Sequence, residues 1–230
     1  MSQIFNKIYD LAMSQMPYKK YARCYLKAIN DQKPLAILEA GCGSGLFLRA
    51  MNEAGLNPVG LDQDPGMLKL AKKRVTNELI LGDICKYSSP QRWNLIYLPL
   101  DVLNYLNKTE LKKALKNLAL QLENGGQILF DVHNKTRLKT MHEAIAKEIV
   151  PQGNFSWQSR KRGKYLIYNI NCELKGNLEN YRLKQRIHSQ REIIKAARNA
   201  NLSCRGVYRA WDLGRVDRKT ARLFFAFVKG

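Results

Sequence analysis

The sequence predicts an α/β fold in which a mainly parallel sheet is covered by helices on both faces. Two observations support this. Over the first 135 residues of the 230-residue chain, short apolar runs alternate with amphipathic segments of helical period. After residue 150, three strand-like runs follow one another across short polar turns, which indicates an antiparallel meander. Short, uninterrupted apolar strands are typical of a sheet that is buried on both faces.

The first part of the chain holds five apolar runs of strand length, at residues 35–40, 58–61, 78–81, 93–98 and 127–132. A helical pattern over residues 46–55 follows the first run and ends at a glycine. Asp64 before Pro65 is a typical helix start, and Asn107 with Glu110 three residues later resembles a capping box. We therefore expect helices between these strands.

The second part begins with the meander, at residues 155–160, 164–174 and 180–188. Ser189 with Glu192 then predicts the start of a helix, and Asn201 a left-handed stop. Two further strands are expected at residues 202–211 and 221–228. The last of these is apolar on both faces, so we expect it inside a sheet rather than at an edge.

The charge of the chain is high and uneven. It has 39 basic and 19 acidic side chains, a net charge of +20. Residues 1–130 hold 17 basic and 11 acidic side chains, a net +6, whereas residues 131–230 hold 22 and 8, a net +14. A strongly basic C-terminal half attracts an RNA backbone, an acidic membrane face or an anionic substrate. Basic residues scattered for solubility remain the alternative.

Other classes of protein are disfavoured. The first 20 residues lack the apolar core of a signal peptide, and the chain has no apolar run near 18 residues, so we expect a cytoplasmic protein without a membrane span. The five cysteines form no C-x-x-C pair, and the three histidines form no ligand-spaced cluster with them. Reduced thiols are expected, with neither disulfides nor a bound metal.

The stretch ILEAGCGSGLFLRAMNEAGLNPVGLD, residues 37–62, reads as strand, glycine loop, helix and strand. Its glycines are Gly41, Gly43 and Gly45, with Glu39 two residues before the first. A dinucleotide-binding loop has the pattern G-x-G-x-x-G/A. Counted from the first or the second glycine, the third place falls on a leucine. The loop therefore does not fit a nicotinamide or flavin dinucleotide.

The pattern E-x-G-x-G-x-G from Glu39 to Gly45 resembles the first motif of class I S-adenosylmethionine-dependent methyltransferases. The resemblance implies that the loop wraps the methionyl part of the cofactor and that Glu39 faces its ammonium group. Asp62, 21 residues past Gly41, matches the acid that binds both ribose hydroxyls. Asp83 matches the acid that accepts from the adenine amino group. The remaining expected cofactor contacts are Tyr18, Cys42, Gly43, Gln63, Met67, Ile84 and Leu98.

Further segments resemble a bacterial branch of that family: IYDLAMSQMPYKKY near the start, LDVLNYL at 100–106, LFDVHNKTRL at 129–138 and IHSQREI at 187–193. The resemblance implies a Rossmann-like sheet of about seven strands, the last antiparallel, with a small antiparallel β insert. It divides the chain into N-terminal helices and a cofactor-binding core at 1–150, a substrate cap at 151–188 and a return to the core at 189–230. Tyr21 in place of a tryptophan, a short insert and a basic loop at 212–220 depart from the branch and leave its substrate open.

The predicted activity is methyl transfer to a small molecule, with anionic molecules among the candidates. Modification of tRNA or rRNA by the basic half is the alternative, and S-adenosylmethionine binding without catalysis is the second. Positioning and desolvation supply most of the acceleration of such a displacement, so a general base is needed only for a protonated, weak nucleophile.

Candidate acceptor-side residues follow from position along the chain. His133, just past the fifth strand, is a candidate base, and Asp101, Asn104 and Tyr105 follow the fourth strand. Leu98-Pro99-Leu100-Asp101 is not the D/N-P-P-Y signature of amino-group methylation. Tyr9 and Tyr18 are candidate lid residues. The basic row Arg182, Lys184, Arg186 and His188 either faces an anionic acceptor or forms an ordinary solvated strand face.

Overall fold

A computed structural model of the chain describes residues 2–29, 34–140, 144–150 and 153–230, without the side chains of 144–150 and 153. One of the three histidines, at position 142, lies outside these ranges. No helix within them is long and apolar enough to cross a bilayer.

The larger sheet has seven strands in the order β10-β11-β5-β4-β1-β2-β3. In chain order they are β1 (Ile37–Ala40), β2 (Val59–Asp62), β3 (Leu79–Leu81), β4 (Trp93–Leu98), β5 (Leu122–His133), β10 (Leu202–Arg209) and β11 (Arg222–Lys229). The pairs among β1 to β5 are all parallel, and β11 is antiparallel to both β5 and β10. The predicted doubly wound, Rossmann-like sheet with an antiparallel last strand is confirmed, and β11 lies inside it as expected.

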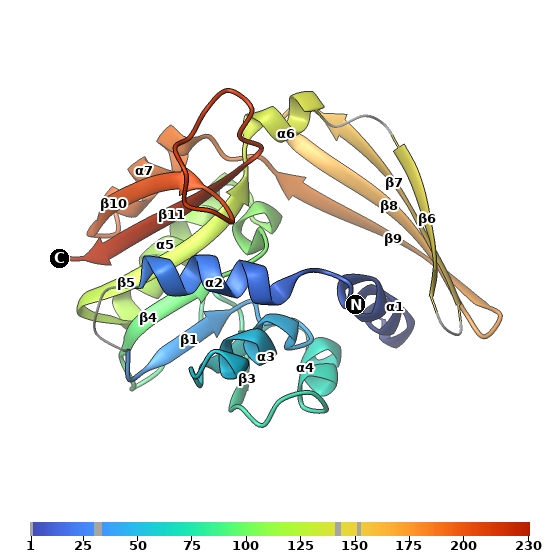
Figure 1. The fold of residues 1–230 in the computed structure, drawn as a ribbon, viewed down its shortest axis with the longest axis horizontal. Helices are drawn as coiled ribbons and strands as arrows, with labels where there is room; N and C mark the ends of the chain where they lie inside the picture. Colours follow the sequence, from blue (N-terminus) through green and yellow to red (C-terminus); the bar gives the residue numbers. More distant parts are fainter. Residues whose placement is uncertain (1, 30–33, 141–143, 151–152) are drawn as a thin grey trace.

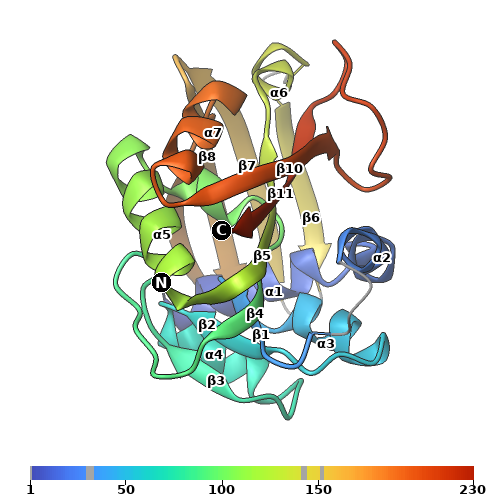
Figure 2. The same ribbon diagram turned by 90° about the vertical axis from the view of Figure 1, so that its left-hand side faces the viewer.

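Helices cover both faces of this sheet (Figure 2). One face packs against α2 (Tyr18–Ala28) and α3 (Leu46–Glu53), and the other against α5 (Lys108–Gln121) and α7 (Gln190–Arg198). Shorter helices are α4 (Pro65–Ala71), the 3₁₀ helix η1 (Val102–Tyr105) and α6 (Lys135–Thr140). The helix starts lie where the sequence predicts them: Asp64 caps α4, and capping boxes open α5 at Asn107 and α7 at Ser189.

The insert is an antiparallel sheet of four strands: β6 (Ala144–Val150), β7 (Gly153–Arg162), β8 (Tyr165–Leu174) and β9 (Asn177–Arg186). The sequence indicated the last three, and β6 is an addition. Figure 1 shows this sheet standing apart from the larger one, with the first helix, α1 (Gln3–Met13), beside it. Phe5 and Ile8 of α1 pack against Phe155 and Ile170 of the insert. The division of the chain at residues 150 and 188 stays a prediction.

A buried ion cluster joins three neighbouring parts of the larger sheet at their carboxyl edge. Arg222, at the start of β11, lies between Asp131 of β5 and Asp101, which follows β4. Its Nη2 is 2.6 Å from Asp101 Oδ1, and its Nη1 donates to Asp131, which is fully buried. Asp131 also accepts from the Tyr25 hydroxyl at 2.6 Å and from the Leu100 N–H at 2.8 Å. One guanidinium thus pairs with two buried carboxylates.

Replacing Arg222 by methionine should lower the free energy of unfolding by about 3–5 kcal/mol, because both buried carboxylates lose their cation. The matched control is Arg205→Met on β10, whose side chain is exposed and should change stability by less than about 0.5 kcal/mol. Chemical denaturation of both variants measures the difference. Equal losses in the two variants would contradict a central role for Arg222.

Candidate active site

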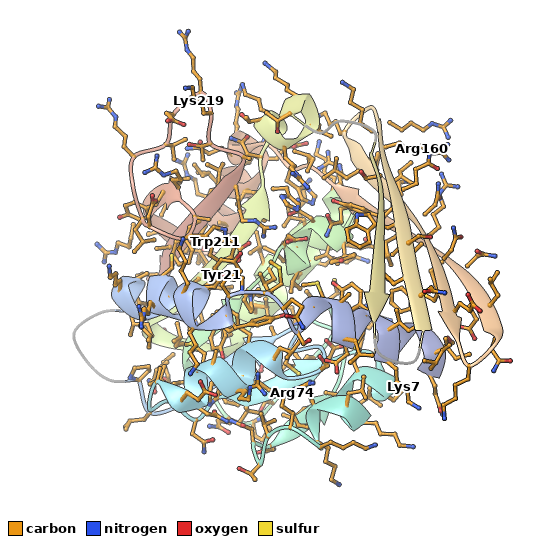
Figure 3. The ribbon with its side chains drawn as sticks, turned by 45° about the vertical axis from the view of Figure 1, so that its right-hand side comes forward. Lys7, Tyr21, Arg74, Arg160, Trp211 and Lys219 are labelled. Atoms are coloured by element: carbon orange, nitrogen blue, oxygen red, sulfur yellow. The ribbon has the colours of Figure 1, made fainter. Side chains whose placement is uncertain are left out.

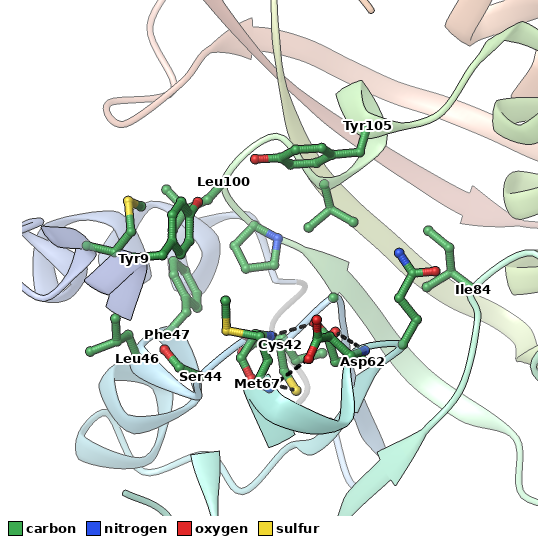
Figure 4. Close-up of a pocket in the computed structure, with 18 of the residues that line it drawn as sticks. Tyr9, Cys42, Ser44, Leu46, Phe47, Asp62, Met67, Ile84, Leu100 and Tyr105 are labelled. Carbon is green, nitrogen blue, oxygen red and sulfur yellow. Dashed lines mark hydrogen bonds between the residues drawn. The ribbon is translucent and has the colours of Figure 1, made fainter. Parts of the chain in front are cut away.

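A cavity of about 500 Å³ opens at the carboxyl ends of β1, β2, β3 and β4. This is the edge at which open α/β sheets bind ligands. Tyr9 of α1 and Leu183 of β9 also contribute to its wall, so the N-terminal helix and the insert meet the core there. Figure 4 shows the acidic group of Asp62 on the opposite side from Tyr9 and Tyr105.

The glycine loop brings bare main chain to the cavity. The Gly41 and Cys42 N–H groups donate to the Leu61 carbonyl at 2.7 and 3.0 Å, which fixes the loop against the end of β2. Gly41 has φ +84°, and a Cβ there would lie 2.7 Å from the side chain of Val102. Gly43, at φ +53°, has open space where its Cβ would be. Glycine at these positions leaves room for a ligand against the backbone.

Asp62 ends β2 with its carboxylate in the cavity wall. Oδ2 accepts from the Gly43 N–H at 2.8 Å, and Oδ1 accepts from the Asp64 N–H at 2.9 Å. A carboxylate has about four acceptor sites, so each oxygen retains capacity for another donor. Burial raises the pKa of Asp62, and the two N–H groups oppose this shift. The side chain is held in one orientation and can accept from two neighbouring hydroxyls.

Glu39 is the deepest acid of the site. It lies on β1, is 1% exposed and accepts from the Tyr97 hydroxyl at 2.5 Å. Burial raises the pKa of Glu39 well above its usual range, and the charge of Asp62 adds to the shift. A cationic group in the cavity would favour the ionised form. The position therefore suits the ammonium end of a ligand.

Helix α1 is attached to the cavity rim by polar side chains. Asp10 accepts from the Ser44 hydroxyl of the glycine loop at 2.5 Å and pairs with Arg74 Nη2 at 2.9 Å. Asn6 donates to Asp64, the cap of α4, at 3.0 Å. These contacts hold Tyr9 over the cavity, and burial raises the pKa of Tyr9 to about 12. Its hydroxyl thus remains a hydrogen-bond donor at neutral pH.

Most of the predicted contacts meet in this one cavity. Its wall includes Tyr18, Glu39, Gly41, Cys42, Gly43, Asp62, Gln63, Met67, Asp83, Ile84 and Tyr105. Leu98 does not contribute, because its side chain is fully buried in the core on the α5 face of the sheet, and Pro99 and Leu100 occupy the wall instead. The roles of these residues toward a cofactor stay predictions.

His133 lies outside the cavity wall, beside the ion cluster of Arg222 and Asp101. Its Nε2 is 3.2 Å from Arg222 Nη2 and 3.7 Å from Asp101 Oδ2. Burial lowers the pKa of His133 to about 4, so the ring is neutral at pH 7 and a weak base. The role of His133 as the base stays a prediction that its low pKa does not favour.

The basic row of β9 does not face the cavity. Leu183 lines it, so Arg182 and Lys184 on either side point to the opposite face, where both are exposed. Arg186 pairs with Glu192 at 2.8 Å, and His188 Nε2 donates to carbonyls of η1 and the residue after it. Arg182 and Lys184 therefore form an ordinary solvated strand face, as the alternative interpretation of the sequence expected. Arg186 and His188 instead have partners within the protein.

Several wall residues had no local sequence signal. Phe5 and Leu183 reach the cavity only because α1 and the insert fold back over the core. The alternation of β9 placed Leu183 on its apolar face but did not indicate what that face covers. Asp131, an acid inside an apolar strand, was the available signal for the ion cluster, since a buried acid requires a partner.

Comparison with known proteins agrees with this geometry. Residues 37–126 match the family model described as a methyltransferase domain. A solved S-adenosylmethionine-dependent methyltransferase from Clostridium acetobutylicum has a TM-score of 0.85 at 19% identity, over 98% of each chain. The chain therefore has the fold of the class I S-adenosylmethionine-dependent methyltransferases, and its residues 37–126 match a methyltransferase domain. The fold expected from the sequence is thereby confirmed.

Two further proteins similar to this chain carry more specific names. A malonyl-[acyl-carrier protein] O-methyltransferase from Priestia megaterium is 32% identical over 148 residues, which are 60% of this chain and 52% of that protein. A solved amino pentose methyltransferase from Micromonospora echinaspora has a TM-score of 0.73 at 16% identity, over 100% of this chain and 98% of that one. The chain spans about half the length of the curated relatives it matches.

The buried histidines His133 and His188 should titrate in the acid range. The pKa values of His133 and His188 are each lowered from 6.5 to about 4, mainly by burial. The unfolded chain therefore binds protons that the folded chain does not, so stability present above pH 6.5 is lost as the pH falls toward 4. Imidazole NMR titration measures both midpoints, with His133→Gln and His188→Gln assigning the signals. Midpoints near 6.5 would contradict the burial seen here.

Proposed function

We propose that this chain transfers the methyl group of S-adenosylmethionine to a small-molecule acceptor. The observation that carries the proposal is the single cavity that joins the glycine loop, Glu39, Asp62 and Asp83 at one edge of the sheet. Three carboxylates beside bare main chain match a ligand with an ammonium group, a vicinal diol and an amino-substituted ring. A pyrophosphate has no such need, and acidic side chains would repel it.

The residues fit the cofactor group by group. Glu39 would accept from the ammonium group, and its buried carboxylate would gain a compensating charge. Asp62 would accept from the two ribose hydroxyls with the acceptor capacity that its two N–H partners leave. Asp83 would accept from the adenine amino group between Met67 and Ile84, which line the same part of the cavity.

When bound, S-adenosylmethionine supplies an electrophilic methyl group on a sulfonium. The chain's own contribution is to orient the two reactants and to exclude water, which accelerates an in-line displacement. Tyr9 and Tyr105 form the wall away from Asp62 (Figure 4). Burial keeps the Tyr9 hydroxyl protonated. The hydroxyl would therefore donate a hydrogen bond to a lone pair of the acceptor or the cofactor, and it would not remove a proton.

A small acceptor suits an enclosed cavity. Helix α1 and the insert both cover it, and the exposed cations of β9 lie on the outer face of the insert. An RNA acceptor would need those cations near the cavity mouth, because phosphate contacts carry most of its binding. The names of the similar proteins, a malonyl-[acyl-carrier protein] O-methyltransferase and an amino pentose methyltransferase, also support an acceptor group of small size.

Replacing Asp62 by alanine should weaken S-adenosylmethionine binding at least tenfold, since each charge-assisted hydrogen bond contributes about 1.5–3 kcal/mol. Calorimetry measures the dissociation constant. The control is Glu123→Ala, which removes an exposed carboxylate at the far end of β5 and should leave the affinity unchanged.

Unchanged affinity in Asp62→Ala would contradict the assigned pocket. Binding without methyl transfer to any of a broad panel of small acceptors would favour the alternative of a non-catalytic binding protein. A steep loss of tRNA or rRNA affinity with salt, together with methylated RNA, would instead favour the RNA alternative.

A further inference from the structure

The inner face of the insert is divided into an apolar end and a polar end. At the apolar end, Phe155 and Ile170 pack against α1. Farther along, Ser159 of β7 is paired with Tyr168 of β8, which is paired with Leu183 of β9. Side chains of paired residues share a face, and Leu183 lines the cavity, so Ser159 and Tyr168 face the core as well.

Gln185 lies on the same face of β9 as Leu183, two residues farther along, and it reaches the core. It is 3% exposed and donates to the carboxylate of Asp101. Its Oε1 is buried without a hydrogen-bond partner in the described part of the chain. The polar end of the insert therefore meets the turn after β4, close to Tyr105.

A second buried atom without a partner belongs to His133. Arg222 can only donate, so its contact with His133 Nε2 at 3.2 Å makes that nitrogen the acceptor. The proton of the neutral ring is then on Nδ1, and Nδ1 has no partner among the residues that the structure describes. The ring thus presents a buried N–H donor that nothing accepts.

The third buried atom without a hydrogen-bond partner among the described residues is Nε of Arg137, in α6 just after β5. Arg137 lies close enough to Tyr168 and His133 that its charge opposes the burial-driven rise of the Tyr168 pKa and lowers the pKa of His133. Within the described ranges, Arg137 forms no ion pair with a carboxylate, whereas Asp101 and Asp131 are both paired with Arg222. Among the described residues of this region, Arg137 is thus the cation without a carboxylate partner.

We propose that Arg137, His133 and Tyr168 form an acceptor subsite that binds an anionic oxygen group, a carboxylate or a phosphate. The inference rests on the proposed function, because it assigns these side chains, outside the described cavity wall, to the acceptor. The buried N–H donors of His133 and Arg137 have no partner within the described residues, and Arg137 is also a cation, which an anion satisfies and an ammonium group does not. Gln185 Oε1 would accept from a hydroxyl or amide N–H beside the anion.

The subsite also explains how an acceptor would be aligned with the cofactor. Leu183 and Tyr105 belong to the cavity wall, and Gln185 and Asp101 are their neighbours on the subsite side. An acceptor anchored by its anion at Arg137 would extend past the pair of tyrosines toward the Asp62 end. The distance between the anionic group and the nucleophilic atom of the acceptor then decides whether that atom reaches the methyl group. Only acceptors with a suitable distance between the two would react.

The test uses the full chain saturated with S-adenosylhomocysteine and titrated by calorimetry with malonate, as a carboxylate, and with inorganic phosphate. We expect Arg137→Ala to weaken binding of at least one of the two anions about ten- to a hundredfold. Arg137→Lys keeps the charge but loses the Nε donor and should be intermediate. The control is Arg160→Ala on the outer face of β7, where Figure 3 shows the side chain pointing away from the core; it should leave anion binding unchanged.

The outcomes separate this proposal from the proposed function. Normal S-adenosylhomocysteine affinity in every variant, with anion binding lost only in the Arg137 variants, supports both, and the anion that responds identifies the source. If the wild-type chain binds neither anion, or if Arg137→Ala and Arg160→Ala weaken binding equally, the subsite is wrong while the cofactor pocket stands. If S-adenosylhomocysteine itself does not bind, both fail.

Discussion

The structure depends on the placement of one guanidinium, that of Arg222, between two buried carboxylates. Asp131 lies near the carboxyl end of β5 and is fully buried, and Asp101 lies in the turn after β4, where Leu100 and Asp101 have left-handed φ values of 59° and 57°. Such a conformation is costly for residues other than glycine and persists where surrounding bonds hold it. The bonds from Asp131 and Arg222 do so, and they thereby fix where η1 begins and where Tyr105 enters the cavity.

The cavity is equally a product of two different attachments of α1. Its polar side chains bind the glycine loop and the α4 cap through Asp10 and Asn6, while Phe5 packs on the apolar end of the insert. Either attachment alone would leave the helix free to turn. Together they hold the insert over the carboxyl edge of the sheet, and so give a general cofactor-binding fold an acceptor side of its own.

The parts of this arrangement that are local in sequence were predictable. Strand positions, the three helix caps and the glycine loop each depend on a few adjacent residues, and Asp62 follows from the end of β2. Other parts depend on residues from 29 to more than 80 positions apart in the sequence: the Arg222 cluster, the position of Leu183 in the cavity wall and the surroundings of His133. The periodicity of a sequence does not indicate contacts over such distances. The positive charge of the basic row on β9 was evident from the sequence. Which way that row faces depends on how the insert packs on the core, which the sequence did not indicate.

The acids of the cavity also have a kinetic consequence. The cavity is lined by four acids, Glu39, Asp62, Asp64 and Asp83, in a chain whose net charge is +20. The electrostatic potential inside the cavity therefore has the opposite sign to the potential far from the protein. An approaching cation is first repelled and is attracted only within about 8 Å, the Debye length at physiological ionic strength. Added salt screens the outer repulsion more than the sheltered inner attraction. Salt should therefore speed the capture of a cationic ligand, in contrast to the usual slowing seen where steering is favourable.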